Sequence, residues 1–296
     1  MDDDEWNRLI DQLRNGDCTP FLGAGASVSA LPAGGDLAGK WADRYDYPFE
    51  DDHDLARVTQ FAALKMRDPV YVKSRLCREL RGIRPPDFNT LEPHALLARF
   101  PLPVYVTTNY DDFIVQSLKA AGKAPNVAMC PWYPDVEYSE QLFLDAAGWN
   151  PQPEAPLVYH LHGRLEYPTS VVLTEDDYLE FVTNLAIARI ADDKRILPPS
   201  ILRALTTRSL LFIGYSLRDW TFRVLFNGLL RAVPGINRRS NVSVQLIPNG
   251  DGKRRDAERN ARLYWSRYFE KWQISIFWGS AQEFCDELRQ RMELDA

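Results

Sequence analysis

The sequence has few cysteines, no long apolar run and no excess of basic residues. Its four cysteines lie far apart and form no CxxC pair, so neither a zinc site nor a disulfide framework is indicated. Apolar stretches such as SLLFIGYSL are much shorter than the roughly 20 residues of a membrane span. A net charge of −6 argues against a general nucleic-acid binder. The acidic start MDDDEW is no secretory signal, so we expect a cytoplasmic protein with reduced thiols.

Short apolar runs alternate with amphipathic helical patterns along the chain. The expected strands are TPFL, PVYVTTN, LVYHLH, SVVL, SLLFIGY, NVSVQLI and QISIFW. The expected helices are DEWNRLIDQLRNGD, YDDFIVQSLKAAG, EDDYLEFVTNLAIARI, RDWTFRVLFNGLLRAV, RRDAERNARLYWSRYF and SAQEFCDELRQRM. This alternation predicts an α/β fold: a Rossmann-like parallel sheet of about six to eight strands with helices on both faces.

The chain reads as one domain over residues 1–296, with a helical insertion at 36–100 after the first βα turn. Residues 123–155 are rich in proline and lack a clear period, so we expect them to be mostly loop. Thr174 is expected to cap the helix that follows it, and Ser280 with Glu283 is expected to form a capping box.

Ligands of open parallel sheets bind beyond the carboxyl ends of the strands, so the residues just after each strand are the most informative. The run FLGAGAS places Gly23, Gly25 and Ser27 after the first strand, which suits either a tight turn or a phosphate cradle. The dinucleotide pattern GxGxxG is incomplete here, because Val28 stands at its third position. GGDLAGKW also matches GxxxxGK, but Trp41 replaces the magnesium-binding Ser or Thr, and no strand precedes it.

Polar residues also follow three later strands. VTTNYDD brings Asn109, Asp111 and Asp112 directly after a buried strand, as helix caps or as a site. In YHLHGRL, His160 and His162 point to the same side of the strand, and we favour His162 as the functional one. FIGYSLRDW places Gly214, Ser216 and Asp219 at a helix start, which suits either a nucleotide or a capped turn.

Taken together, these four strand ends resemble the sirtuin fold. GAGAS is similar to its first phosphate loop, TTNYD to its Asn-x-Asp motif, HLHG to its catalytic His-Gly, and GYS to its second nucleotide-contacting turn. The zinc module with two CxxC pairs is missing, and ALPAGGDLAGKW stands where sirtuins carry Pro-Asp-Phe-Arg. Both departures, with TEDDYLEF and GYSLRDW, resemble the sirtuin-like effectors of bacterial antiphage defence. This resemblance implies an NAD⁺ glycohydrolase that is silent until infection and then depletes NAD⁺.

The resemblance also implies roles for individual residues. His162 would be the general base, Asn109 would orient the water and the ribose, and Asp111 would contact the nicotinamide amide. The other implied contacts of NAD⁺ are Gly23, Ala24, Gly25, Ser27, Thr108, Gly214, Tyr215, Ser216 and Asp219. We expect the His162 ring to face a cavity that reaches Gly25 and Ser216, with no metal taking part.

Other functions stay open at this point. The chain could be an NAD⁺-dependent deacylase or ADP-ribosyltransferase, or a non-catalytic sensor of NAD⁺ or ADP-ribose. Since an NADase that is always active would poison its host, we expect control by a regulatory or sensor protein, by a homo-oligomer, or by both. No membrane and no direct nucleic-acid partner is expected. The sequence does not distinguish ADP-ribose from cyclic ADP-ribose as product, or NAD⁺ from NADP⁺ as substrate.

Overall fold

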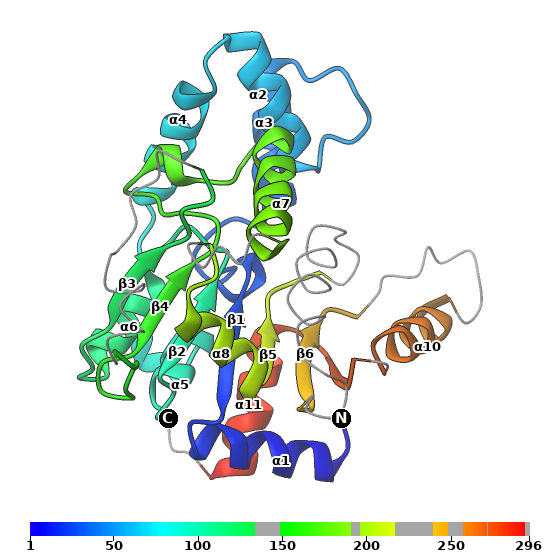
Figure 1. Cartoon of the computed structure of the whole chain (residues 1–296). Helices are drawn as coiled ribbons and strands as arrows, with labels where there is room; N and C mark the ends of the chain where they lie inside the picture. Colours follow the sequence, from blue (N-terminus) through cyan, green and yellow to red (C-terminus); the bar gives the residue numbers. More distant parts are fainter. Residues whose placement is uncertain (134–148, 191–195, 217–238, 248–256, 271, 294–296) are drawn as a thin grey trace.

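A parallel sheet forms the centre of the computed structural model, which describes residues 1–133, 149–190, 196–216, 239–247, 257–270 and 272–293 (Figure 1). Within these residues, seven strands make one sheet in the order β3–β4–β2–β1–β5–β6–β7, and all neighbours are parallel. The strands are β1 (Cys18–Leu22), β2 (Val104–Thr107), β3 (Asn126–Met129), β4 (Leu157–His160), β5 (Ser209–Ile213), β6 (Asn241–Gln245) and β7 (Ile274–Trp278). The predicted α/β, Rossmann-like fold is therefore confirmed.

Helices cover both faces of this sheet. Successive side chains of a strand point to opposite faces, so Leu210 and Phe212 belong to one core, and Leu211 and Ile213 belong to the other. The described helices are α1 (Asp3–Arg14), α2 (Gly34–Tyr45), α3 (Leu55–Met66), α4 (Pro69–Arg81), α5 (Pro93–Ala98), α6 (Phe113–Ala120), α7 (Glu175–Ile190), α8 (Pro199–Thr207), α10 (Ala257–Glu270) and α11 (Ala281–Met292). Short 3₁₀ turns lie at η1 (Ala24–Ala26), η2 (Phe88–Thr90) and η4 (Pro168–Ser170).

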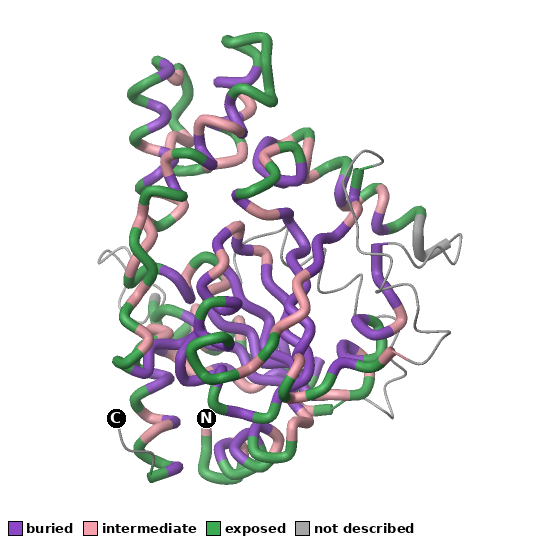
Figure 2. The backbone as a smooth tube through the Cα atoms, turned by 90° about the vertical axis from the view of Figure 1, so that its left-hand side faces the viewer, coloured by how far each residue is buried: buried purple, intermediate pink, exposed green. Residues whose placement is uncertain are grey.

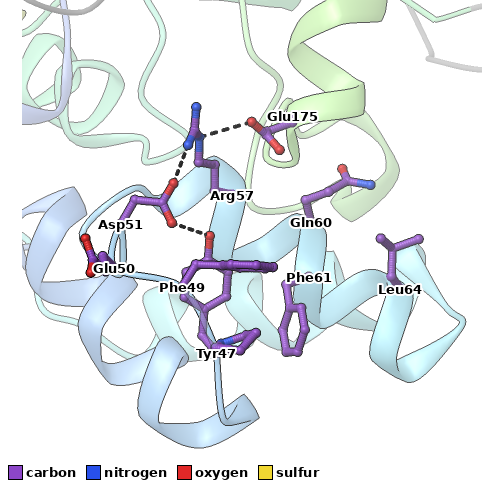
Figure 3. Close-up of a pocket in the computed structure, with 10 residues that line it drawn as sticks. Tyr47, Phe49, Glu50, Asp51, Arg57, Gln60, Phe61, Leu64 and Glu175 are labelled. Carbon is purple, nitrogen blue, oxygen red and sulfur yellow. Dashed lines mark hydrogen bonds and ion pairs between the residues drawn. The ribbon is translucent and has the colours of Figure 1, made fainter.

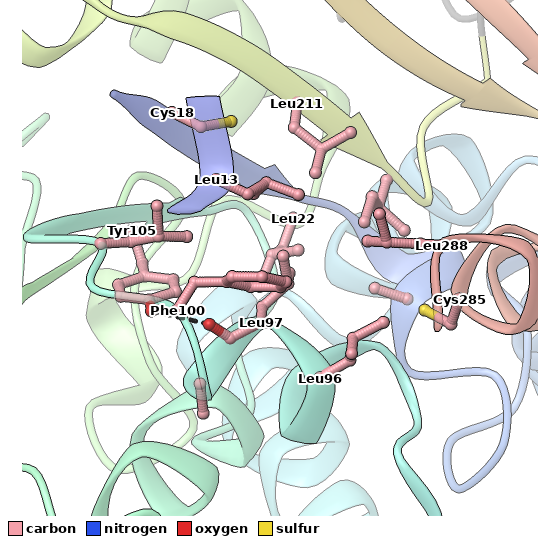
Figure 4. Close-up of a cluster of buried hydrophobic side chains, with 14 of the residues drawn as sticks. Leu13, Cys18, Leu22, Leu96, Leu97, Phe100, Tyr105, Leu211, Cys285 and Leu288 are labelled. Carbon is pink, nitrogen blue, oxygen red and sulfur yellow. Dashed lines mark hydrogen bonds between the residues drawn. The ribbon is translucent and has the colours of Figure 1, made fainter. Parts of the chain in front are cut away.

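One of the two sheet cores joins strands β1, β2 and β5 to helices α1, α5 and α11 (Figure 4). Its buried phenol, on Tyr105, donates a hydrogen bond to the carbonyl of Leu97 in α5 at 3.0 Å. Helix α5 therefore packs on the sheet, although its residues fall inside the range predicted for the helical insertion. Figure 2 shows how such buried residues run through the centre of the molecule, with exposed residues around them.

Helices α2, α3 and α4 form a third core of their own beside the sheet. Trp41, Val58 and Leu76, one from each helix, are completely buried in it. Val171 and Leu173 complete this core from the segment that leads into α7. In Figure 1 these helices and α7 stand together above the end of the sheet where the strands finish. We call α2–α4 the helical insertion below.

Two expectations about strands were wrong. SVVL is not a strand: Ser170 ends the turn η4, and residues 171–173 pair with no strand among the described residues. Their alternating pattern arises because Val172 enters a sheet core while Val171 and Leu173 enter the core of the helical insertion. Instead, β3 is the seventh strand, within a range expected to be loop. It is an edge strand that pairs only with β4 among the described residues.

The predicted helix caps are confirmed. Thr174 Oγ1 accepts a hydrogen bond from the amide of Asp177 at 3.3 Å, and Ser280 and Glu283 form the capping box of α11. The helix predicted at RDWTFRVLFNGLLRAV lies outside the described residues. None of the helices that the structure describes is long and apolar enough to cross a bilayer.

Candidate active site

The turns after β1, β2, β4 and β5 meet at one edge of the sheet. Strand β1 lies between β2 and β5, and the strand order runs outward from β1 in both directions. Open α/β sheets bind ligands at the carboxyl ends of the strands at such a point. The Thr108 amide donates to Leu22 O at 3.0 Å, and the Gly25 amide donates to Gly214 O at 3.0 Å. These bonds hold three of the four predicted strand ends directly against one another.

Close backbone packing explains the glycines of the first and fourth turns. Gly214 has a φ of +85°, and a Cβ there would lie 2.3 Å from the Ala26 nitrogen. A Cβ on Gly25 would lie 2.7 Å from Gly214 Cα. Both positions therefore require glycine for the turns to touch, whether or not a phosphate binds.

Most amides of the GAGAS turn are already used by the protein. The amides of Gly23, Gly25, Ala26 and Ser27 donate to backbone carbonyls. Within the described part of the chain, the amide of the exposed Ala24 has no such acceptor. The sequence left a tight turn and a phosphate cradle as alternatives. The structure shows a tight turn in which one amide, that of Ala24, is free for an anion among the described residues.

The Asn109 side chain is fixed by two hydrogen bonds. It is 8% exposed, and its Nδ2 donates to Gly23 O at 3.1 Å and to Ser27 Oγ at 3.0 Å. Since Gly23 O can only accept, the amide nitrogen must face the protein. No described donor binds Oδ1, so this oxygen is left for a ligand or a water molecule.

Asp111 holds the Ser27 hydroxyl that accepts from Asn109. Its Oδ2 accepts the Ser27 hydroxyl at 3.1 Å, and its Oδ1 accepts the Phe113 amide at 3.0 Å at the start of α6. Burial raises the pKa of Asp111 above its usual value, against which the charge of His94 and these hydrogen bonds lower it. The sequence left a helix cap and a site as alternatives, and this carboxyl both accepts the first amide of α6, from the position before the cap residue Asp112, and holds Ser27.

His160 is completely buried behind Asn109. Its Nδ1 lies 3.1 Å from the carbonyl of Asn109, so Nδ1 carries the proton and donates. Its Nε2 lies 3.8 Å from Asp112 Oδ1 and has no hydrogen-bond partner among the described residues. Burial, and then the charge of Arg164, lowers the pKa of His160 to about 4, so the ring is neutral. Asp112 is itself held by Arg164, through contacts of 2.8 and 2.9 Å.

His162 follows the end of β4 and is 8% exposed. Two rings of α7 lie edge-on to its imidazole, Tyr178 at 5.4 Å and Phe181 at 4.9 Å between ring centroids. Burial alone lowers the pKa of His162 to about 3, so the ring is neutral at physiological pH. A cavity that joins this ring to Gly25 and Ser216 stays a prediction.

The backbone conformation at Gly163 explains why glycine follows His162. It has a φ of +82°, and a Cβ there would lie only 2.1 Å from Ser170 O. The chain turns sharply at this point and returns, so that the Val172 amide donates to His162 O at 3.0 Å. The turn places the start of α7 beside the histidine.

The remaining predicted NAD⁺-contacting residues are Thr108, Tyr215, Ser216 and Asp219, of which Tyr215 contacts two neighbouring strand ends. Its hydroxyl donates to Leu22 O at 2.8 Å, so the Thr108 hydroxyl, 2.9 Å away, donates to Tyr215. Ser216 is exposed, and Asp219 lies outside the described residues. Among the residues that the structure describes, no group of three His, Cys, Asp or Glu side chains could hold a metal ion, and the four cysteines are free and buried.

The family assignment follows from comparison with known proteins. A family model described as SIR2-like domain matches residues 103–277, more than half of the chain. The chain belongs to the SIR2-like family. The resemblance inferred from the four strand ends is thereby confirmed at the level of this family. The SIR2-like match contains Asn109, His162 and Tyr215, whereas the GAGAS turn precedes it.

Curated relatives of this SIR2-like chain carry one name. It is 26% identical over 214 residues to the NAD(+) hydrolase ThsA of Enterococcus faecium, a match that covers 72% of this chain and 40% of that protein. It is 29% identical to NAD(+) hydrolase ThsA of Cytobacillus dafuensis, over 71% of this chain and 37% of that protein. The match to NAD(+) hydrolase ThsA of Bacillus cereus (strain MSX-D12) is 30% identical over 43% of this chain and 22% of that protein. This chain thus spans less than half of the length of these relatives.

Sequence reasoning missed the aromatic wall of His162. Tyr178 and Phe181 are three residues apart on α7 and therefore share a helix face. That spacing is visible in the sequence, but nothing in it indicates that this face would lie against the His-Gly turn of a SIR2-like protein.

Proposed function

We propose that this chain binds NAD⁺ at the carboxyl edge of its sheet and hydrolyses the bond between nicotinamide and ribose. The products would be nicotinamide and ADP-ribose. Membership of the SIR2-like family and the name NAD(+) hydrolase on several relatives support this proposal. The structural observation that carries it is the anchored Asn109 carboxamide, whose oxygen has no donor among the described residues.

The chemistry needs positioning more than strong acid catalysis. When the glycosidic bond breaks, its electron pair goes to the cationic ring nitrogen, and nicotinamide leaves as a neutral molecule. The ribose then carries the positive charge until the oxygen of a water molecule bonds to C1′. Asn109 Oδ1 is suited to accept a hydrogen bond from that water or from a ribose hydroxyl, because both donors of its amide are occupied.

His162 and Asp111 supply the rest of the proposed site. A neutral imidazole has a free lone pair, so His162 can accept the proton that water loses and pass it to solvent. The carboxyl of Asp111 lies one hydroxyl away from Asn109, through Ser27. When ionised, it places a negative charge in a poorly solvated setting, which favours a cationic ribose.

The wider role is also a proposal. We propose an NADase of antiphage defence that acts in the cytoplasm and depletes NAD⁺ once a regulatory protein or self-assembly activates it. The supporting observation is that the matched relatives are longer than this chain, so their remaining length leaves room for control. A constantly active NADase would also deplete the NAD⁺ of its own host.

Nicotinamide release from NAD⁺ by the purified protein tests the function. We expect release at the same rate with and without an acetyl-lysine peptide. His162→Ala and Asn109→Ala should each lower the rate by about 100- to 10,000-fold without unfolding the protein. His53→Ala is the matched control, because that side chain is 84% exposed. Release that depends on the peptide would indicate a deacylase instead. Binding of NAD⁺ without turnover in both wild type and His162→Ala would indicate a sensor.

A further inference from the structure

The first turn of α7 is fastened to the helical insertion at several points. Gln60 of α3 donates to Asp176 Oδ2 at 2.7 Å and accepts the Asp176 amide at 3.1 Å. Arg57 of α3 pairs with Glu175 at 3.3 Å, and Figure 3 shows this pair bridging the two helices beside an open pocket. These contacts are exposed, and exposed pairs contribute little to stability.

The fourth contact differs because it is buried. Lys73 of α4 pairs with Asp177 at 2.6 Å, and their side chains are only 8% and 13% exposed. The pair uses Asp177 Oδ1, while Oδ2 accepts the amides of Leu173 and Thr174 at 2.9 Å each. The ammonium group also lies 5.5 Å from the ring centre of Trp132. One carboxylate thus ties α4 to the backbone at the start of α7.

The next residues of α7 pack against His162. Tyr178 directly follows Asp177, and Phe181 lies one helical turn beyond it. Both rings lie edge-on to His162. The buried ion pair at Asp177 thus lies next to the two rings that pack against the imidazole.

We propose that Lys73 is a positioning residue, which acts through Asp177 to hold Tyr178 and Phe181 against His162. Its importance for catalysis rests on the NAD⁺ hydrolysis proposed above. Breaking a buried pair by removing one partner leaves an uncompensated charge, which is far more disruptive than losing an exposed pair. In Lys73→Met, the Asp177 carboxylate would need water, so the first turn of α7 would shift outward and admit water to His162.

The basicity of His162 would report that shift. Removal from water is the cause of its lowered pKa, with no contribution from a charged neighbour. Of the two described side chains in ring contact with His162, Tyr178 is the titratable one, and Asp177 precedes it on the same helix. Loosening α7 should therefore raise the pKa of His162 from about 3 toward the ordinary 6.5.

The test is an NMR titration of His162 in the full chain, compared between wild type, Lys73→Met, Asp177→Asn and Arg57→Met. We expect a rise of at least about one pKa unit in the first two variants. Arg57→Met also removes a contact between the helical insertion and α7, but an exposed one, and should leave the pKa unchanged. His162→Gln identifies the resonance. Because the imidazole is no longer held in place, the same variants should lower kcat for NAD⁺ by about tenfold or more, although the raised pKa by itself would make His162 a stronger base. Arg57→Met should leave kcat unchanged.

The outcomes separate this proposal from the function. If wild type releases no nicotinamide but Lys73→Met raises the pKa of His162, hydrolysis is wrong and the positioning role holds. If Lys73→Met folds, hydrolyses NAD⁺ normally and leaves the pKa unchanged, the positioning role is wrong. Should Lys73→Met fail to fold, the milder Asp177→Asn, which keeps an oxygen for the two amides, decides the question by the same titration.

Discussion

The hydroxyl of Ser27 connects Asn109 to Asp111, so Ser27→Ala tests the site network at its centre. The hydroxyl is buried, accepts from Asn109 Nδ2 and donates to Asp111 Oδ2. Its removal deletes one bond to a carboxyl and one neutral bond. At about 1.5–3 kcal/mol for the first and about 1 kcal/mol for the second, we expect the free energy of unfolding to fall by about 2.5–4 kcal/mol. At about 2.1 cal/mol/K per residue, the unfolding entropy of 296 residues is roughly 0.6 kcal/mol/K, so Tm should fall by roughly 4–6 °C.

The effect of Ser27→Ala on Tm should also depend on pH. Burial already raises the pKa of Asp111 in the folded state, and losing the Ser27 donor raises it further. A carboxyl with a raised pKa favours the folded state most at low pH, and this contribution is lost as the pH rises through the folded-state value. The gap in Tm between wild type and Ser27→Ala should therefore widen from mildly acidic to neutral pH.

Thermal unfolding followed by circular dichroism at several pH values measures this gap. Ser29→Ala is the control, since Ser29 is exposed two residues further on. Activity should change as well. Because Asn109 loses one of its two hydrogen-bond acceptors, the kcat of Ser27→Ala should be lower by about tenfold or more, with a smaller change in KM. A Tm gap that is absent, or that narrows as the pH rises, would refute the network described here.

Two further predictions concern the turns and the histidines. Gly214→Ala should unfold the protein or lower its Tm strongly, because the new Cβ would clash with the Ala26 nitrogen. Gly34→Ala, where nothing lies within 4 Å, should leave the Tm nearly unchanged in the same melt. In urea titrations, the free energy of unfolding should fall as the pH falls from 6.5 toward 4, because the pKa of His160 is lowered to about 4 and that of His162 to about 3. The double variant His160→Gln/His162→Gln should flatten this dependence, and an unchanged slope would contradict the burial of both rings.

Much of the fold could be predicted because its strands are short, apolar and bounded by turn residues. The parallel sheet followed from the alternation of strands and helices. The edge strand β3 was missed because only its second half, Ala128 and Met129, is buried, and prolines lie near both of its ends. SVVL misled because residues that alternate between two cores have the same period as a strand.

The place of the candidate residues in the fold could be predicted, but their contacts only in part. The strand-end rule predicted that Asn109 and His162 lie at the carboxyl ends of strands, and the structure places them after β2 and β4, which pair with each other. The sequence could not show that Gly25 and Gly214 are needed for each other, because that contact joins turns almost 200 residues apart. Nor could it show that Lys73 of α4 pairs with Asp177 at the start of α7, because this pair depends on how the helical insertion packs against α7.

The most direct test of the account is to incubate the protein with NAD⁺ in water labelled with heavy oxygen and to separate the products by chromatography with mass spectrometry. We predict free nicotinamide without label and ADP-ribose with one heavy oxygen on its ribose, with almost no product from Asn109→Ala. Label in AMP or nicotinamide mononucleotide, or equal product from Asn109→Ala, would contradict the claim that the anchored Asn109 carboxamide serves cleavage at the nicotinamide ribose.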